Sequence, residues 1–172
     1  DAATAAVQGG GDIEFNGTGQ SSVVNGGLLA VQNGDLRFND ATVLAFDGGL
    51  MDLDGGSVLV SNSAAVSMAG ASAGTVQNGG DLVLRDSASL AMDSASTFTI
   101  LGGDVSIEDV ATAALSSGHI AVSGGSFEAA TDVQLALDSQ ATITVNGGDF
   151  RATGANVDSE DSTVSVSSGS AH

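Results

Sequence analysis

Aspartates recur along this chain at intervals that would stack their carboxylates in rows. The first row follows a glycine at the start of a repeated block and comprises Asp12, Asp35, Asp81, Asp104 and Asp149. A second row falls near the next turn and comprises Asp40, Asp86, Asp109 and Asp132. A third comprises Asp47, Asp93, Asp138 and Asp161. Carboxylates about one strand spacing apart repel one another unless cations screen or bridge them.

Two interpretations of these rows stay open. Calcium is a hard cation that takes several oxygen ligands, so the first and second rows are candidate calcium sites, with turn carbonyls completing the shell. Aspartate is also a favoured turn residue whose side chain bonds to nearby backbone amides without any metal. The Gly-Gly-x-Gly-x-Asp repeat of calcium-binding toxins is not reproduced, and no other cofactor is predicted.

Catalytic residues are scarce. His119 and His172 are the only histidines, and nothing in their spacing singles out a nucleophile with a base and an orienting acid. Paired carboxylates could do acid-base work on sugars. Such sites usually need long loops and stacking aromatics, whereas this chain has near-uniform blocks and neither Trp nor Tyr. We therefore expect no enzyme.

The composition excludes some partners. The formal charge of −18 comes from 21 acidic residues against Arg37, Arg85 and Arg151. Nucleic-acid binding requires cationic groups facing phosphates, so no nucleic-acid partner is expected. The sequence has no apolar run of about 18 residues, which predicts no membrane span. No signal peptide is recognisable, and the start at Asp1 favours a processed, exported chain.

A repeat organises the whole chain. Blocks of 22–24 residues begin at Gly11, Gly34, Gly56, Gly80, Gly103, Gly125 and Gly148, each followed by Asp or Ser. Each block holds three runs in which apolar residues alternate with polar ones, for example Leu82/Leu84, Leu90/Met92 and Phe98/Ile100. Period two is the signature of strands, and Gly, Asn, Asp and Ser fill the corners between the runs.

These features predict an all-β fold, a single-stranded parallel β-helix of about seven triangular coils. We expect right-handed winding because parallel crossovers are overwhelmingly right-handed. Residues 1–172 form one domain, in which 1–10 is a partial coil and 167–172 a polar tail. Three coils fit the pattern less well, at Val23–Gly27, Gly70–Gly74 and Val157–Asp161, and we expect these to bend, bulge or open first.

The outward residues suggest two surfaces. Threonine pairs at Thr97/Thr99, Thr142/Thr144 and Thr163/Ser165 resemble the flat arrays of ice-binding solenoids, but His119/Ala121 interrupts them, and exposed threonines also simply favour strands. Small residues line the outward positions of the second run, which would permit lateral packing or form a neutral surface: Ala45, Ser67, Ala91, Ala114 and Ala136.

Neither end carries a recognisable cap. An uncapped solenoid presents unpaired backbone and apolar core, so we expect either a longer parent chain, end-to-end self-association into a filament, or a cap that the sequence does not reveal.

The repeat resembles the parallel β-helix repeats of bacterial surface adhesins, the autotransporter passengers and filamentous-haemagglutinin-like proteins. The Gly-Asp/Ser coil starts, the three alternating runs and the Asn-Gly-Gly corners at Asn25, Asn78 and Asn146 carry this resemblance. It implies an extracellular or cell-surface structural protein, a rigid acidic rod in an adhesin or a filament subunit. It transfers no functional residue, because fold alone does not fix function.

Overall fold

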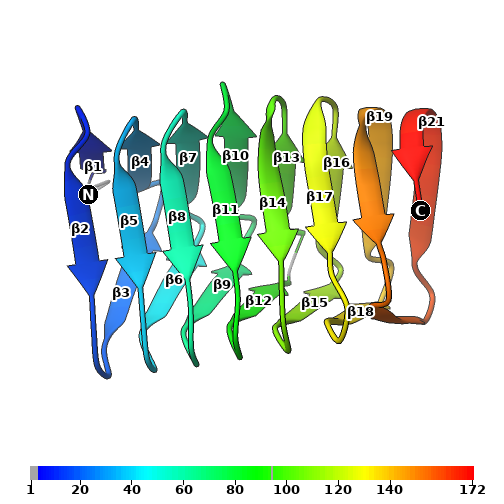
Figure 1. The fold of residues 1–172 in the computed structure, drawn as a ribbon, viewed down its shortest axis with the longest axis horizontal. Coiled ribbons are helices and arrows are strands. Elements are labelled where there is room, and N and C mark those ends of the chain that lie inside the picture. Colours follow the sequence, from blue (N-terminus) through cyan, green and yellow to red (C-terminus); the bar gives the residue numbers. More distant parts are fainter. Residues whose placement is uncertain (1–3, 94) are drawn as a thin grey trace.

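The computed structural model describes residues 4–93 and 95–172, and within them the chain forms strands and turns with no helix. Successive strands wind into stacked coils, so that strands from consecutive coils lie side by side along one long axis (Figure 1). The chain descends at the front of Figure 1, rises at the back and advances toward the C-terminus, which is a right-handed path. The predicted all-β parallel solenoid of about seven coils is confirmed.

Three faces run along the rod. The first face is formed by β2 (Asp12–Phe15), β5 (Asp35–Phe38), β8 (Ser57–Val60), β11 (Asp81–Leu84), β14 (Gly103–Ile107), β17 (Gly125–Ala129) and the later parts of β19 (Thr142–Ala152) and β21 (Thr163–Ala171). The second face is formed by β3 (Gln20–Val24), β6 (Val43–Asp47), β9 (Ala65–Ala69), β12 (Ser89–Met92), β15 (Thr112–Ser116), β18 (Gln134–Asp138) and β20 (Asn156–Ser159). The third face is formed by β1 (Thr4–Gln8), β4 (Leu28–Gln32), β7 (Leu50–Asp54), β10 (Ala73–Gln77), β13 (Thr97–Ile100), β16 (His119–Val122) and the first parts of β19 and β21.

Neighbouring strands pair in parallel, with like positions of the repeat in register. Inward residues therefore stack in columns, and the middle of the rod is fully buried: Leu82, Leu84 and Ile100 expose none of their surface. The interior is a single apolar cluster that extends from Val7 to Phe150.

Glycine at the coil start is required by the stacking itself. A Cβ added at Gly103 would lie 2.0 Å from the carbonyl oxygen of Gly80, and one at Gly125 would lie 1.9 Å from that of Gly103. Real Cβ atoms do not approach backbone so closely. The coil-start glycines, which stack in register and are called the glycine column below, therefore allow successive coils to pack closely at this corner.

The coil around Gly74 is regular, contrary to our expectation of a bend or bulge there. β10 pairs without a register shift with both β7 and β13. The Phe98 side chain of the next coil fills the space, because a Cβ added at Gly74 would meet its ring at 2.5 Å. The irregularity lies instead between β19 and β21, where the register shifts at Val145, Asn146 and Gly148.

The polar residues after Val166 continue as a strand. Gly169, Ser170 and Ala171 pair with Gly148, Asp149 and Phe150, so they begin an eighth layer on the first face. A Cβ at Gly169 would lie against the carbonyl oxygen of Gly148, which identifies Gly169 as a further member of the glycine column. The segment that we predicted as a tail thus carries the repeat one step further.

Candidate functional site

The first aspartate row forms a real ladder on the first face, but serines interrupt it. The register runs Asp12, Asp35, Ser57, Asp81, Asp104, Ser126, Asp149, Ser170. Each serine hydroxyl donates to the aspartate of the coil before it: Ser57 Oγ lies 2.6 Å from Asp35 Oδ1, and Ser126 Oγ lies 2.7 Å from Asp104 Oδ1. Ser170 donates to Asp149 in the same way.

Two arginines neutralise parts of this row. Arg37 Nη2 lies 3.0 Å from Asp35 Oδ2, and Arg151 Nη2 lies 3.2 Å from Asp149 Oδ2. Both pairs are about half exposed, so each contributes at most about 1 kcal/mol to stability. Their main effect is to reduce repulsion along the row near each end of the rod.

Asp81 and Asp104 are adjacent aspartates in the middle of the rod. Burial raises the pKa of the Asp81 carboxyl above its usual value, and the neighbouring charge of Asp104 raises it further. The pair is therefore the place in the row where a counter-charge would act most favourably.

Aspartates of the second row lie in turns and accept hydrogen bonds from the backbone. Asp40, Asp86 and Asp109 have left-handed backbone with φ of 60°, 60° and 58°, a conformation that Asp and Asn tolerate better than most residues. Their carboxylates accept hydrogen bonds from backbone amides one coil earlier: Asp40 from Gly17 N at 2.9 Å, and Asp86 and Asp109 from Asn62 N and Asp86 N at 3.3 Å. This arrangement corresponds to the turn interpretation of these residues.

Asp132 does not belong to the column of the second row. Four residues separate Ile107 from Thr112 and four separate Ala129 from Gln134, so the residue equivalent to Asp109 is Thr131. Asp132 follows one position later, again with positive φ. Counting from the coil-start glycine shows the same offset, since Asp109 follows Gly103 by six residues and Asp132 follows Gly125 by seven.

Uncharged residues interrupt the third row. Asp47 pairs with Ala69, and Asp138 pairs with Ser116. On its other side Asp138 has an acidic neighbour, but the equivalent position in that coil is Glu160 and not Asp161. In the described part of the chain, no three His, Cys, Asp or Glu side chains gather as a metal site would require.

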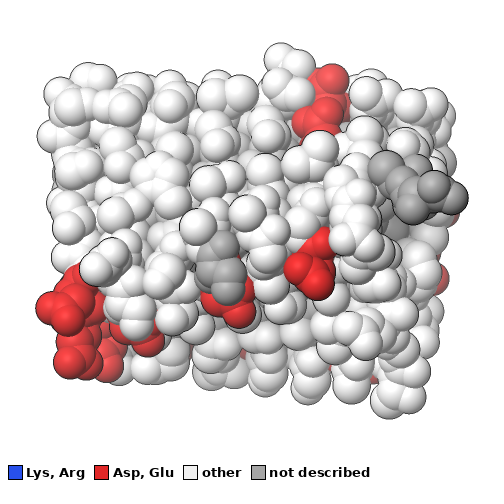
Figure 2. All heavy atoms as spheres, turned by 180° about the vertical axis from the view of Figure 1, so that it is seen from behind, with Lys and Arg blue, Asp and Glu red and all other residues white. Residues whose placement is uncertain are grey.

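The outward positions of the described third face carry only two acidic residues, Asp52 and Asp54 in β7. Its outward positions toward the C-terminal end carry Ala73/Thr75, Thr97/Thr99, His119/Ala121, Thr142/Thr144 and Thr163/Ser165. Figure 2 shows this back side of the rod as largely uncharged, with a few separate acidic spots. His119 Nδ1 contacts Thr142 Oγ1 there, so His119 is part of the threonine surface. Ice binding by this surface stays a prediction.

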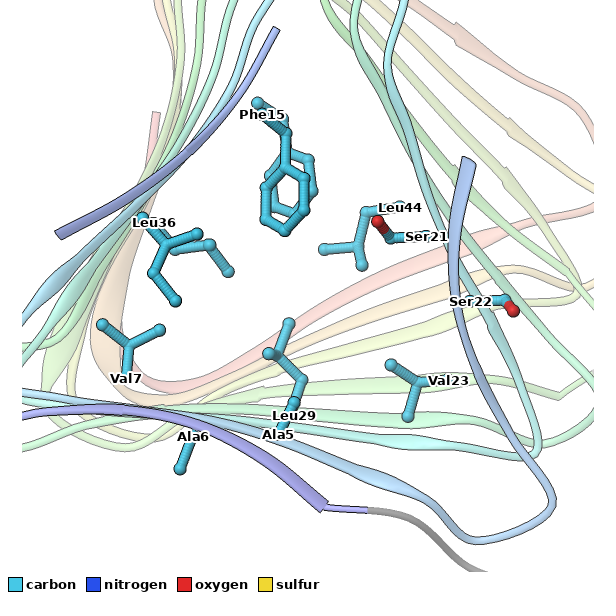
Figure 3. Close-up of a pocket in the computed structure, with 12 residues that line it drawn as sticks. Ala5, Ala6, Val7, Phe15, Ser21, Ser22, Val23, Leu29, Leu36 and Leu44 are labelled. Carbon is cyan, nitrogen blue, oxygen red and sulfur yellow. The ribbon is translucent and has the colours of Figure 1, made fainter. Parts of the chain in front are cut away.

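Both ends of the rod expose apolar core. At the N-terminal end, Ile13 and Phe15 are 43% and 38% exposed beside an apolar cleft of about 220 Å³. Figure 3 looks into this cleft and shows Val7, Phe15 and Leu29 pointing inward. At the C-terminal end, Val164 and Val166 are 46% and 45% exposed. Each end therefore leaves apolar side chains uncovered that equivalent positions in the middle of the rod bury.

Sequence reasoning overlooked the residues that shape the two ends. Gly169-Ser170 follows Gly148-Asp149 by 21 residues, and this spacing is the signal that could have revealed the extra strand. The basic side chains of Arg37, Arg151 and His172 fall in one outward column. Their common distance of three residues from Gly34, Gly148 and Gly169 is the signal that could have revealed it.

The chain was compared with known proteins in three ways. No protein-family model, no curated protein and no solved structure matches it. Across the described residues, no helix is long and apolar enough to cross a membrane.

Proposed function

We propose that this chain is an extracellular structural protein, a rigid acidic rod that serves as a surface-adhesin stalk or as the subunit of an end-to-end filament. The observation that carries the proposal is the in-register stacking of three strand faces along the rod, together with apolar core left open at both ends. Stacked parallel strands transmit load through many backbone hydrogen bonds at once, and the continuous core resists bending.

The site geometry supports a structural role over a chemical one. In the first row, Asp35, Asp104 and Asp149 bind serine or arginine side chains. The corner carboxylates of Asp40, Asp86 and Asp109 accept hydrogen bonds from backbone amides. Their charge keeps the sides of the rod soluble and mutually repulsive, which favours association through the ends.

Negative-stain electron microscopy of the purified chain in calcium-containing buffer tests the proposal. We expect either unbranched fibres of one narrow width, which would identify the filament form, or single rods about 38 Å long, from eight layers at about 4.8 Å each. Globular particles or amorphous aggregates would contradict a rod of either kind.

A calcium-binding module is the second candidate, and the adjacent Asp81 and Asp104 carboxylates favour it. Burial is the main cause of the raised pKa of Asp81, and the charge of Asp104 raises it further. A divalent cation bound between the two carboxylates would relieve that repulsion. Melting curves with calcium and with chelator, at equal ionic strength, separate the candidates, because a specific ligand stabilises the folded state by mass action. A calcium-specific rise that disappears in Asp81→Asn would support the module, and identical curves would eliminate it.

A further inference from the structure

The two ends of the rod differ from each other in a complementary way. The first and third faces each have eight strands, because β21 contributes to both, whereas the second face has seven. The C-terminal end therefore presents an extra first-face strand, and the N-terminal end presents an extra third-face strand, β1.

We propose that a second copy of this chain stacks on the C-terminal end in one register, with β21 pairing with both β1 and β2 of the next copy. Thr163 would neighbour the next copy's Thr4, and Ser170 would neighbour its Asp12. This inference rests on the filament form of the proposed function and specifies its joint.

The polar row of the first face continues across such a joint. Within the chain a serine separates Asp35 from Asp81 and another separates Asp104 from Asp149. Ser170 would stand between Asp149 and the Asp12 of the next copy in the same manner, so that no two aspartates meet at the joint. Like charges directly opposite each other destabilise a sheet, and this register avoids them.

The neighbouring outward column supplies charge complementarity. Glu128 pairs with Arg151 near the C-terminal end, and Glu14 pairs with Arg37 near the N-terminal end. His172 continues the strand, because its backbone N donates to Phe150 O at 3.0 Å and its carbonyl accepts from Ala152 N at 2.7 Å. The basic Arg151 and His172 would then face the Glu14 of the next copy.

No contact within the described chain requires glycine at position 11. Its φ is not positive, and a Cβ there would meet nothing closer than Gln8 O at 3.4 Å. Its equivalents in the stack, such as Gly34 with a 2.4 Å clash against Gly11 O, cannot carry a side chain. In the proposed register Gly11 rests on Gly169 of the other copy, where the same restriction applies.

On the second face the joint would leave a gap, and the inward residues of the terminal strands are suited to it. Its five internal strands carry two apolar inward residues each, but the terminal strands carry an inward serine, Ser21 in β3 and Ser159 in β20. Figure 3 shows Ser21 pointing into the interior at the N-terminal end. In the proposed joint, one second-face strand is missing between β20 of one copy and β3 of the next. We call this gap the window, and the two serines would line it.

Engineered disulfides test the register, since the chain has no cysteine of its own. In Asp12→Cys/Ser170→Cys, the joint would place the two Cα atoms about 4.8 Å apart, within disulfide reach. The two thiols lose two protons and two electrons to added diamide, which is reduced to its hydrazine. In the control Ser22→Cys/Asp158→Cys, the window would keep the Cα atoms roughly 10 Å apart, beyond that reach.

We expect a ladder of linked chains on a non-reducing gel for the first variant and monomer for the control. Fibres with links in the control, or in neither variant, would overturn this register while keeping the filament. The absence of fibres from the native chain would overturn both the filament and the register.

A second measurement uses Gly11→Ala. We expect its unfolding midpoint to match the native chain while end-to-end association weakens about tenfold or more, because the added Cβ meets the other copy. The control is Gly19→Ala at the same end, whose Cβ would meet no atom within 4 Å and which should assemble normally. Undiminished assembly of Gly11→Ala would overturn the register.

Discussion

The middle coils and the N-terminal coil of the rod carry the same inward pattern but bury it to different degrees. Leu82 and Leu84 of β11 are fully buried, whereas the equivalent Ile13 and Phe15 of β2 are 43% and 38% exposed. The chemistry of the residues is alike, and the difference lies in whether a coil rests on each side.

This contrast shows that one coil does not enclose its own core. In a solenoid each repeat buries its apolar residues only against its neighbours, so stability is a sum of interfaces between repeats. A residue in the middle belongs to two such interfaces, and one at the end belongs to a single interface. Equivalent substitutions should therefore cost far more in the middle.

The largest difference is expected for phenylalanine. Phe98→Ala should lower the free energy of unfolding by about 3–5 kcal/mol, because it leaves a cavity opposite Gly74. Phe15→Ala should cost about 1 kcal/mol, since the ring is partly exposed and stacks only on Phe38, at 5.0 Å between ring centres. Urea unfolding followed by circular dichroism measures both, and equal losses would contradict the nearest-neighbour account.

The next largest loss of stability is expected for substitutions in the glycine column. Gly103→Ala should cost about 3 kcal/mol, since its Cβ would collide with the Gly80 carbonyl oxygen at 2.0 Å. The adjacent Gly102→Ala is a matched control, because its Cβ would meet only Asn78 N at 3.9 Å and its φ is not positive. We expect the control to change the thermal midpoint little. A similar loss in both would show that close stacking on Gly80 is not the reason for glycine at position 103.

The corners should matter less than the core. Asp86→Ala should cost about 1 kcal/mol, through loss of the hydrogen bond from Asn62 N and through alanine's poor tolerance of positive φ. Asp86→Asn should keep most of the stability, since asparagine tolerates this backbone conformation. If Asp86→Asn were as damaging as Asp86→Ala in the same denaturation assay, charge would be the important property of this row.

The smallest effect is a pH dependence at Asp81. Its folded-state pKa is raised, first by burial and then by Asp104, so the folded chain holds this proton more tightly than the unfolded chain. The Asp81 carboxyl therefore adds to the free energy of unfolding at acidic pH, and this contribution is lost as the pH rises through the folded-state pKa. Asp81→Asn should stabilise the chain by less than about 1 kcal/mol at pH 7.

The thermal midpoints of the native chain and Asp81→Asn, measured from pH 3 to pH 7, check this sign. The gain in Asp81→Asn should shrink as the pH falls toward the usual aspartate pKa of 3.8. A native chain more stable than the variant at pH 7 would show that the Asp81 charge is favourably paired, as a bound cation would make it.

Most of the fold was predictable because the same pattern of turns and strands occurs seven times in the sequence. The glycines from Gly11 to Gly148 mark the coil starts, and alternation such as Leu82/Leu84 marks the strands. The candidate rows were predictable only in part. The first row was predicted correctly because each member directly follows a coil-start glycine. Asp132 lies one residue outside the second row, as its distance of seven residues from Gly125 already indicates. Asp161 has the same distance from its glycine as Asp138, yet only the register shows that Glu160 takes its place.

The sequence by itself determined the coil length, the strand periodicity and the acidic character, since each is a local property repeated along the chain. The tertiary structure decided which carboxylates become neighbours, that Phe98 fills the space over Gly74, and that Gly169–Ala171 begins another layer. These are contacts between residues more than 20 positions apart, whose register depends on every intervening corner. A one-residue change in a corner leaves the local pattern intact but moves a side chain from one column to the next.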